Sequence, residues 1–194
     1  MFFVEDASPP EDIAYFRQIR QQRATPLAMG ELFSSPHQWT PLIQERLIDY
    51  MRMHISDMGG VAPARKVATM GEIFGVKTAW HGPPDTTPIG LVAKLHLDLA
   101  CYNFGIQQFA GFCERKVVFR PCPEVKDGYM GVNDLLGWGM EVDEKMAAKY
   151  PYGAWSGAEK IAGMVVGTKF AVPMTTSSSS KPGRKSPLSA LVGC

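Results

Sequence analysis

The sequence lacks the features of a nucleic-acid-binding or membrane protein. Its 20 basic and 19 acidic side chains nearly cancel to a formal net charge of +1, and the basic residues are spread along the chain. An electrostatic footprint for nucleic acid or an anionic membrane is therefore missing. No apolar run approaches the roughly 20 residues needed to span a bilayer, and the N-terminal MFFVEDASPP lacks the basic flank of a signal peptide. These absences predict a cytoplasmic protein whose partner is a small molecule.

Cysteine is also scarce. The four cysteines, at positions 101, 113, 122 and 194, show no CxxC spacing and no histidines at zinc-finger distances. This pattern argues against a structural zinc site or a disulfide framework and fits a reducing compartment. A chain of 194 residues with 45% hydrophobic and 20% charged residues is suited to a globular domain.

Short apolar runs alternate with longer amphipathic stretches at a period of roughly 25 residues, which is the pattern of βα units. The runs are candidate strands because each is too short for a helix and is bounded by glycine, proline or charge. They lie at residues 1–5, 26–31, 49–56, 76–81 and 104–109. Strands joined by helical crossovers predict a parallel sheet, whereas a closed barrel of this type needs about eight strands.

The predicted helices have readable ends. Prolines and the acids Glu11 and Asp12 favour a helix start, and that helix should run to about residue 23. A second helix, at 62–74, should stop at Gly75, because glycine readily adopts the left-handed conformation of a helix end. Thr87 and Pro88 open a third helix that reaches about residue 99.

The periodicity ends after about residue 111, which divides the chain into three parts. Residues 1–112 carry the βα pattern, and 113–152 are rich in glycine, proline and aromatic residues, which predicts an ordered loop. Residues 153–194 include TTSSSSKPGRKSP, a low-complexity stretch with too little apolar surface to offset the entropy of ordering. This last part is predicted to be a disordered C-terminal tail.

Polar residues recur where successive strands end. In a βα barrel the carboxyl ends of the strands share one face, so these side chains should converge on one pocket. The set comprises Glu5, Glu31, Arg52 with His54, His81 with Asp85, and Gln108. Two carboxylates on neighbouring strand ends are hard ligands suited to Mg²⁺. An ion there would hold a substrate carboxylate and stabilise the enediolate formed when a proton leaves the adjacent carbon.

Each of these residues also has a structural interpretation. Glu5 or Glu31 would equally serve as a helix cap or a surface residue, and His81 as a hydrogen-bonded packing residue. Arg52 would equally serve as a structural ion-pair partner. Recurrence at the same place in successive units favours the pocket, but spacing alone predicts a metal and anion site without naming a reaction.

Six motifs, in order, resemble the C-terminal half of the mannonate dehydratase family, which belongs to the mandelate racemase-like enolase superfamily. They are FFVEDASPPE, PLAMGELF, LIDYMRMHISDMGG, WHGPPDTTP, LHLDLACYNFGIQQF and GWGMEVDEKMAAKYPY, and they cover about residues 1–152. The resemblance implies a partial TIM-type (β/α)7β barrel, from about the fourth to the eighth strand. It also implies that 113–152 pack on the barrel and a cap, and that the complete family protein is a homo-oligomer.

The resemblance further implies roles for the strand-end residues. Glu5 and Glu31 resemble the second and third Mg²⁺ ligands, and His81 the acid that also contacts substrate. Arg52, Asp85 and Gln108 resemble substrate contacts, although the family often has glutamate where Gln108 stands. The implied reaction is dehydration of a sugar acid, such as mannonate or gluconate, to a 2-keto-3-deoxy acid. The first metal ligand and the third-strand catalytic residues would precede Met1, so a truncated and inactive chain is expected.

Two alternatives remain open at the level of sequence. An acid-sugar racemase or epimerase would place an aspartate beside the seventh-strand histidine, and His54 occupies that place instead. A non-catalytic regulatory or oligomerisation partner derived from the family is the other alternative.

Overall fold

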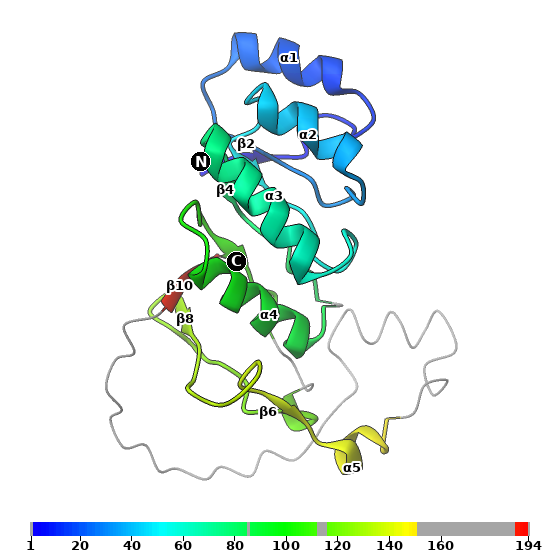
Figure 1. The fold of residues 1–194 in the computed structure, drawn as a ribbon, viewed down its shortest axis with the longest axis vertical. Helices are drawn as coiled ribbons and strands as arrows, with labels where there is room; N and C mark the ends of the chain where they lie inside the picture. Colours follow the sequence, from blue (N-terminus) through cyan, green and yellow to red (C-terminus); the bar gives the residue numbers. More distant parts are fainter. Residues whose placement is uncertain (1, 85, 112–115, 151–188, 194) are drawn as a thin grey trace.

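Strands and helices alternate from the N-terminus of the computed structural model, which describes residues 2–84, 86–111, 116–150 and 189–193. Their order confirms the predicted succession of βα units, and Figure 1 shows α1 to α4 following one another along the molecule. The elements are β1 (Val4–Glu5), α1 (Ile13–Gln22), β2 (Leu27–Met29), α2 (Pro36–Gln44), β3 (Tyr50–Met51), α3 (Val61–Phe74), β4 (Lys77–Thr78), α4 (Pro88–Leu99) and β5 (Gln107–Gln108).

The first four strands form one parallel sheet in sequence order. β5 continues beside β4, because Thr78 and Phe104 form a parallel bridge and the Gln108 amide donates to the Trp80 carbonyl at 3.3 Å. Within the described residues these strands lie side by side in sequence order and do not close into a barrel. This order matches the predicted partial barrel, and parallel strands have their carboxyl ends at one edge.

Helix ends follow local signals in the sequence. The Asp12 side chain accepts from the Ala14 amide at 3.1 Å and begins α1, and Gly75 ends α3 with a φ of 75°. Thr87 caps α4 by accepting from the Gly90 amide at 3.1 Å. Helix α2 is one of the predicted helical crossovers, but no bounds were predicted for it, although Ser35 and Gln38 form a capping box at its start.

The main core cluster joins the strands to the helices that cover them. Phe16 of α1, Leu42 of α2 and Met51 of β3 are each 0% exposed and belong to this cluster. Trp80, which follows β4, belongs to it as well. The carboxyl ends of the strands are therefore anchored by a packed interior.

Residues 116–150 are ordered, as predicted, but they carry strands rather than loop alone. β6 (Phe119–Arg120) pairs with β9 (Glu141–Val142), and β7 (Val125–Lys126) pairs with β8 (Tyr129–Gly131). The turn between β7 and β8 has Asp127 and Gly128 at φ values of 53° and 78°. Asp-Gly favours such a two-residue hairpin turn, so its signal was present in the sequence. The short helix α5 (Glu144–Ala147) follows β9.

The predicted disordered tail contains one described strand, β10 (Ser189–Gly193), which pairs parallel with β5 and antiparallel with β8. The structure differs from the prediction for these five residues. Their sequence, SALVG, is mostly apolar, and the strand occupies one edge of β5 and one edge of β8. The rest of the tail, 153–188 and residue 194, lies outside the described residues.

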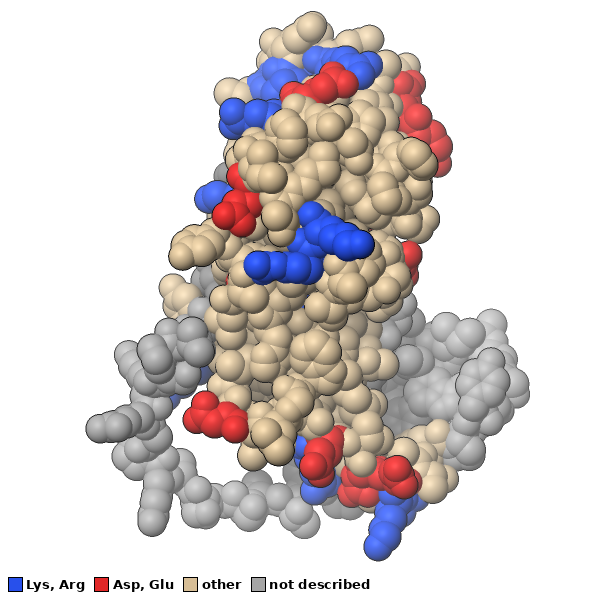
Figure 2. All heavy atoms as spheres, in the orientation of Figure 1, with Lys and Arg blue, Asp and Glu red and all other residues tan. Residues whose placement is uncertain are grey.

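Charged side chains of both signs are interspersed over the face in Figure 2, with a broad uncharged area between them. This face carries no extended patch of one sign. Among the described residues, no helix combines the length and apolar character needed to cross a bilayer.

Candidate functional site at the strand ends

The polar residues predicted at strand ends lie at one edge of the sheet. Glu5 is the last residue of β1, and Gln108 is the last residue of β5. Arg52 directly follows β3, while Glu31 and His81 lie two and three residues beyond β2 and β4. Because these strands are parallel and in register, the side chains approach one another from neighbouring strands.

Glu5, Glu31 and His81 form the tightest group at this edge. Each offers one ligand atom, and the three atoms lie within 4.8 Å of one another. The His81 Nε2 atom lies 3.4 Å from Glu31 Oε2. Two carboxylates this close repel each other unless a cation or a proton lies between them. The donor set therefore fits a divalent cation that prefers oxygen ligands.

Arg52 connects this group to the neighbouring strands. Its Nε donates to Glu5 Oε1 at 2.7 Å, and its side chain is 5% exposed. The Nη1 atom donates to the Ala79 carbonyl at 3.2 Å, and Nη2 donates to Gln108 Oε1 at 2.8 Å. The buried guanidinium thus has a charged partner and fixed acceptors, which offsets the cost of removing it from water.

His81 is buried, and the groups around it shift the pKa of its imidazole in opposite directions. Burial lowers the pKa of His81, the Glu31 carboxylate raises it and the Arg52 guanidinium lowers it, with a net downward shift. The Nδ1 atom has no hydrogen-bond partner among the described residues. The His81 carbonyl accepts from the fully buried Lys94 ammonium of α4, which anchors the backbone that presents the ring.

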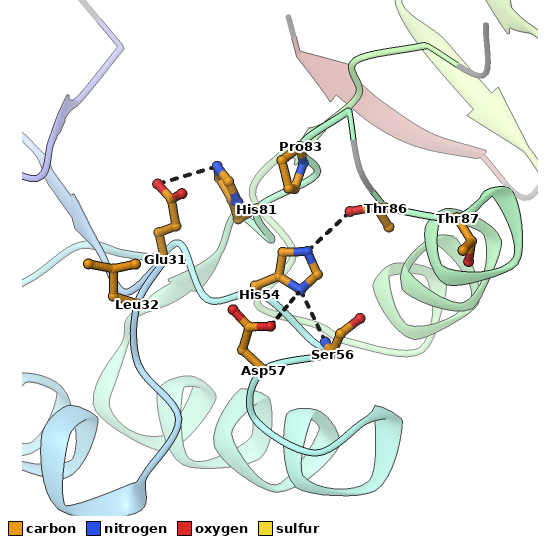
Figure 3. A pocket seen from close by; sticks show the side chains of 9 residues that line it. All are labelled: Glu31, Leu32, His54, Ser56, Asp57, His81, Pro83, Thr86 and Thr87. Atoms are coloured by element: carbon orange, nitrogen blue, oxygen red, sulfur yellow. Dashed lines mark hydrogen bonds and ion pairs between the residues drawn. The ribbon is translucent and has the colours of Figure 1, made fainter. Parts of the chain in front are cut away.

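A cavity of about 360 Å³ opens beside this group. In Figure 3, His54 lies between Thr86 on one side and Asp57 with Ser56 on the other. The His54 Nδ1 atom accepts from the Ser56 amide at 3.2 Å, and Nε2 lies 3.1 Å from Thr86 Oγ1. Accepting at Nδ1 places the proton of the neutral ring on Nε2. The cavity is lined by Glu31, Leu32, His54, Ser56, Asp57, His81, Pro83, Thr86 and Thr87.

Asp6 is a site residue that the sequence prediction missed. Burial raises the pKa of Asp6, and the nearby charges of Glu5 and Glu31 raise it further, while Arg52 lowers it. The residue follows β1 directly and has a φ of 49°. An acid immediately after a strand-end glutamate was the available signal. Asp6 adds a third carboxyl group to the electrostatics of this edge.

Of the predicted site residues, Asp85 lies outside the described residues. The structure brings the other five together, because Arg52 contacts Glu5 and Gln108, and Glu31 contacts His81. The predicted roles of these residues in binding and catalysis stay predictions.

The chain is similar to known proteins of one family. The enolase C-terminal domain-like family matches residues 1–146. A D-galactonate dehydratase family member from Enterocloster bolteae is 51% identical over 152 residues, which are 78% of this chain and 38% of that protein. A second member, from Salmonella enteritidis, is 49% identical over 78% of this chain and 36% of its own length.

A solved structure has a similar fold. A crystal structure from Pantoea ananatis, described as an enolase with bound D-gluconate and Mg, has a TM-score of 0.76 and 49% identity. The match covers 78% of this chain and 37% of that one. The chain thus spans between 36% and 38% of the length of these relatives.

Proposed function

Because the chain belongs to the enolase C-terminal domain-like family, we propose that it carries part of the active site of a Mg²⁺-dependent sugar-acid dehydratase, a hydro-lyase. The observation that carries this proposal is the approach of Glu5, Glu31 and His81 to within 4.8 Å at the strand ends. Relatives named as D-galactonate dehydratase family members support it. The bound D-gluconate and Mg of the Pantoea ananatis structure support it further.

Glu5 and Glu31 are the proposed Mg²⁺ ligands. Their carboxylates are hard oxygen donors on adjacent strands, and Mg²⁺ is usually held by a few carboxylates with water and substrate completing its shell. Imidazole nitrogen suits softer metals, so His81 is assigned to proton transfer rather than to coordination. When bound, the cation supplies positive charge that stabilises the enediolate formed as a proton leaves the carbon next to the substrate carboxylate.

His81 and Arg52 perform the remaining steps assigned to this chain. The proton on C2 goes to a base outside the described residues, and the C3–O bond breaks as His81 gives the leaving hydroxyl its proton. Water departs, and the enol that remains tautomerises to a 2-keto-3-deoxy acid. The lowered pKa of His81 favours the neutral ring, whereas the adjacent Glu31 carboxylate favours the proton-bearing form that donation requires. Arg52 holds Glu5 in place throughout.

The proposed substrate is an aldonic acid of the mannonate or gluconate type. The cavity beside His81 is lined by His54, Ser56, Asp57 and Thr86, whose polar groups suit a chain of hydroxyls. Asp85 is proposed as a further hydroxyl contact by its resemblance to the mannonate dehydratase family. A homo-oligomeric complete protein and a cytoplasmic location are likewise proposals.

The test compares the 194-residue chain with the same chain fused behind the N-terminal part of the Pantoea ananatis relative. Both are incubated with D-mannonate, D-gluconate or D-galactonate, with and without Mg²⁺, and 2-keto-3-deoxy product is measured. The fused protein should dehydrate at least one acid and require Mg²⁺. The chain alone should give no product, because two carboxylate ligands bind Mg²⁺ weakly and the proposal assigns the base to the N-terminal part of the fused protein.

Two results would overturn this proposal. Epimerised or racemised acid without dehydration would place the site in the racemase class. Product from the chain alone would show that this chain already contains a complete catalytic set.

A further inference from the structure

Gln108 uses its side-chain oxygen within the protein. Its Oε1 accepts from Arg52 Nη2 at 2.8 Å and from the Gly82 amide at 2.9 Å. Both partners are obligate donors, so the orientation of the amide is determined by the network: the reverse orientation would turn NH₂ towards two N–H groups. A carbonyl oxygen has two lone pairs, and both have partners here. The oxygen is therefore not available to a substrate hydroxyl.

The two groups that Gln108 joins belong to opposite sides of the candidate site. Through Arg52 it reaches Glu5, whose Oε1 accepts from Arg52 Nε at 2.7 Å. Through Gly82 it fixes the backbone directly after His81. The backbones of the two residues are also close, since a Cβ atom at Gly82 would lie 2.2 Å from the backbone carbonyl oxygen of Gln108. One side chain thus links a proposed metal ligand to the proposed proton donor.

We infer that Gln108 is a positioning residue, which holds Arg52 against Glu5 and the Gly82 backbone beside His81, and that only its amide NH₂ remains to donate to substrate. This inference rests on the proposed metal site. The predicted role of Gln108 as a substrate contact is thereby restricted. Its NH₂ group can only donate a hydrogen bond, so it would contact an oxygen acceptor of the substrate. Within the described residues, Glu5 is the only charged acceptor of Arg52. Because Gln108 is neutral, it does not compete with Glu5 for the positive charge of Arg52.

Two substitutions separate the parts of this role. Gln108→Leu removes both hydrogen bonds, so Arg52 is no longer held against Glu5 and the Glu5 carboxylate is no longer oriented for a cation. Gln108→Glu keeps an acceptor for Arg52 and Gly82, and it adds a negative charge near the site that attracts a cation. Cation affinity should therefore follow the order Glu, then Gln, then Leu at position 108. Outer partners of metal ligands typically change affinity by roughly 10-fold or more.

A matched control is available in α2. Gln38 is half-buried like Gln108, and its Oε1 also accepts from two donors, the Ser34 and Ser35 amides, each at 2.9 Å. Gln38→Leu removes a comparable pair of hydrogen bonds whose donors are unrelated to Arg52. If Gln108→Leu acts only through the loss of an amide oxygen that accepts two hydrogen bonds, Gln38→Leu should have the same effect.

The first measurement is the Nε–H resonance of Arg52 in ¹⁵N–¹H spectra of the full chain without metal. The resonance should exchange slowly with water in the unmodified chain and in Gln38→Leu. In Gln108→Leu the resonance should shift, and its proton should exchange at least ~10-fold faster, because the outer partner that orients Arg52 has been removed. In Gln108→Glu the acceptor is restored, so the proton should again exchange slowly. An unchanged resonance in Gln108→Leu overturns the positioning role.

The second measurement is Mn²⁺ binding by the same four proteins, followed by electron paramagnetic resonance. The predicted affinity order, with Gln38→Leu equal to the unmodified chain, supports the inference. Mn²⁺ binding that is equal in all four proteins overturns the link from Gln108 to the metal site and leaves that site standing. No Mn²⁺ binding by the unmodified chain overturns the proposed metal site, while the Arg52 resonance still decides the positioning role.

Discussion

Arg52 of the third strand end and Glu5 of the first are joined by a hydrogen bond of 2.7 Å between Nε and Oε1. The strand between them contributes Glu31, which does not take part in this pair. Arg52 is 4% exposed, and Glu5 is the more exposed partner. A Glu5 carboxylate oxygen also lies within 4.8 Å of ligand atoms of Glu31 and His81, so Glu5 belongs both to the pair with Arg52 and to the proposed metal site.

Glu31→Gln should weaken Mn²⁺ binding to the full chain at least ~10-fold, because removing one of two proposed ligands costs more than disturbing an outer partner. The fold should persist, since Glu31 is partly exposed and lies outside the core. Isothermal titration calorimetry measures the affinity. Glu45→Gln, which alters an exposed ion pair with Arg17, is the control. Equal affinity in Glu31→Gln and in the control would remove Glu31 from the ligand set.

His81→Asn in the fused, complete protein should reduce dehydration roughly 10²–10⁴-fold, the usual contribution of a general acid. Mg²⁺ affinity should change little, because His81 is assigned to proton transfer. Steady-state kinetics and metal titration give the two readouts. An unchanged rate with a lowered melting temperature would instead identify His81 as a packing residue.

The residues of the candidate site, and their place at one edge of the sheet, were predictable from sequence because they follow from regular secondary structure. Parallel strands in register bring their carboxyl ends to one edge, so a polar residue at each strand end is enough to predict convergence. Gly75 and Thr87 were predictable for a similar reason, since a helix end depends on local chemistry.

The contacts between those residues were not predictable. The Gln108 oxygen meets Arg52 and Gly82 only because β4 and β5 approach closely, which is a property of tertiary packing. The raised pKa of Asp6 likewise depends on burial. No bounds were predicted for helix α2 although its capping box is local, and Pro41 inside it obscures the helical pattern.

Gly82→Ala should destabilise the chain by about 1–3 kcal/mol or more, the usual range for overpacking. The new Cβ would meet backbone, namely the Gln108 carbonyl oxygen at 2.2 Å and its carbon at 3.0 Å. Urea denaturation measures the change. Gly90→Ala is the contrast, because its nearest contact is the Thr86 Cγ2 atom at 3.1 Å and alanine favours helix. Equal stability in the two variants would contradict the close approach of β4 and β5.

Asp98 should make stability depend on pH. Burial raises the pKa of Asp98 well above its ordinary value of 3.8. A raised pKa means that the folded state binds the proton more tightly, so the contribution of Asp98 is fully present below about pH 3.8 and is lost as pH rises through the higher folded-state pKa. The unfolding free energy of the unmodified chain, relative to Asp98→Asn, should therefore fall as pH rises above about 4.

Denaturant unfolding at a series of pH values measures this difference. Glu72→Gln, at an exposed acid of α3, controls for the general effect of removing a carboxylate. If the unfolding free energy of the unmodified chain instead rises with pH relative to Asp98→Asn, Asp98 is stabilised as the charged form in the folded protein.

The measurement that most directly tests the metal site is a crystal structure of the fused, complete protein grown with Mn²⁺, with anomalous scattering used to locate the ion. The expected peak lies between the Glu5 and Glu31 carboxylates, with one oxygen of each at about 2.0–2.2 Å, while Arg52 keeps the other oxygen of Glu5. A peak elsewhere, or carboxylates of Glu5 and Glu31 that do not contact the ion, would contradict the proposed site.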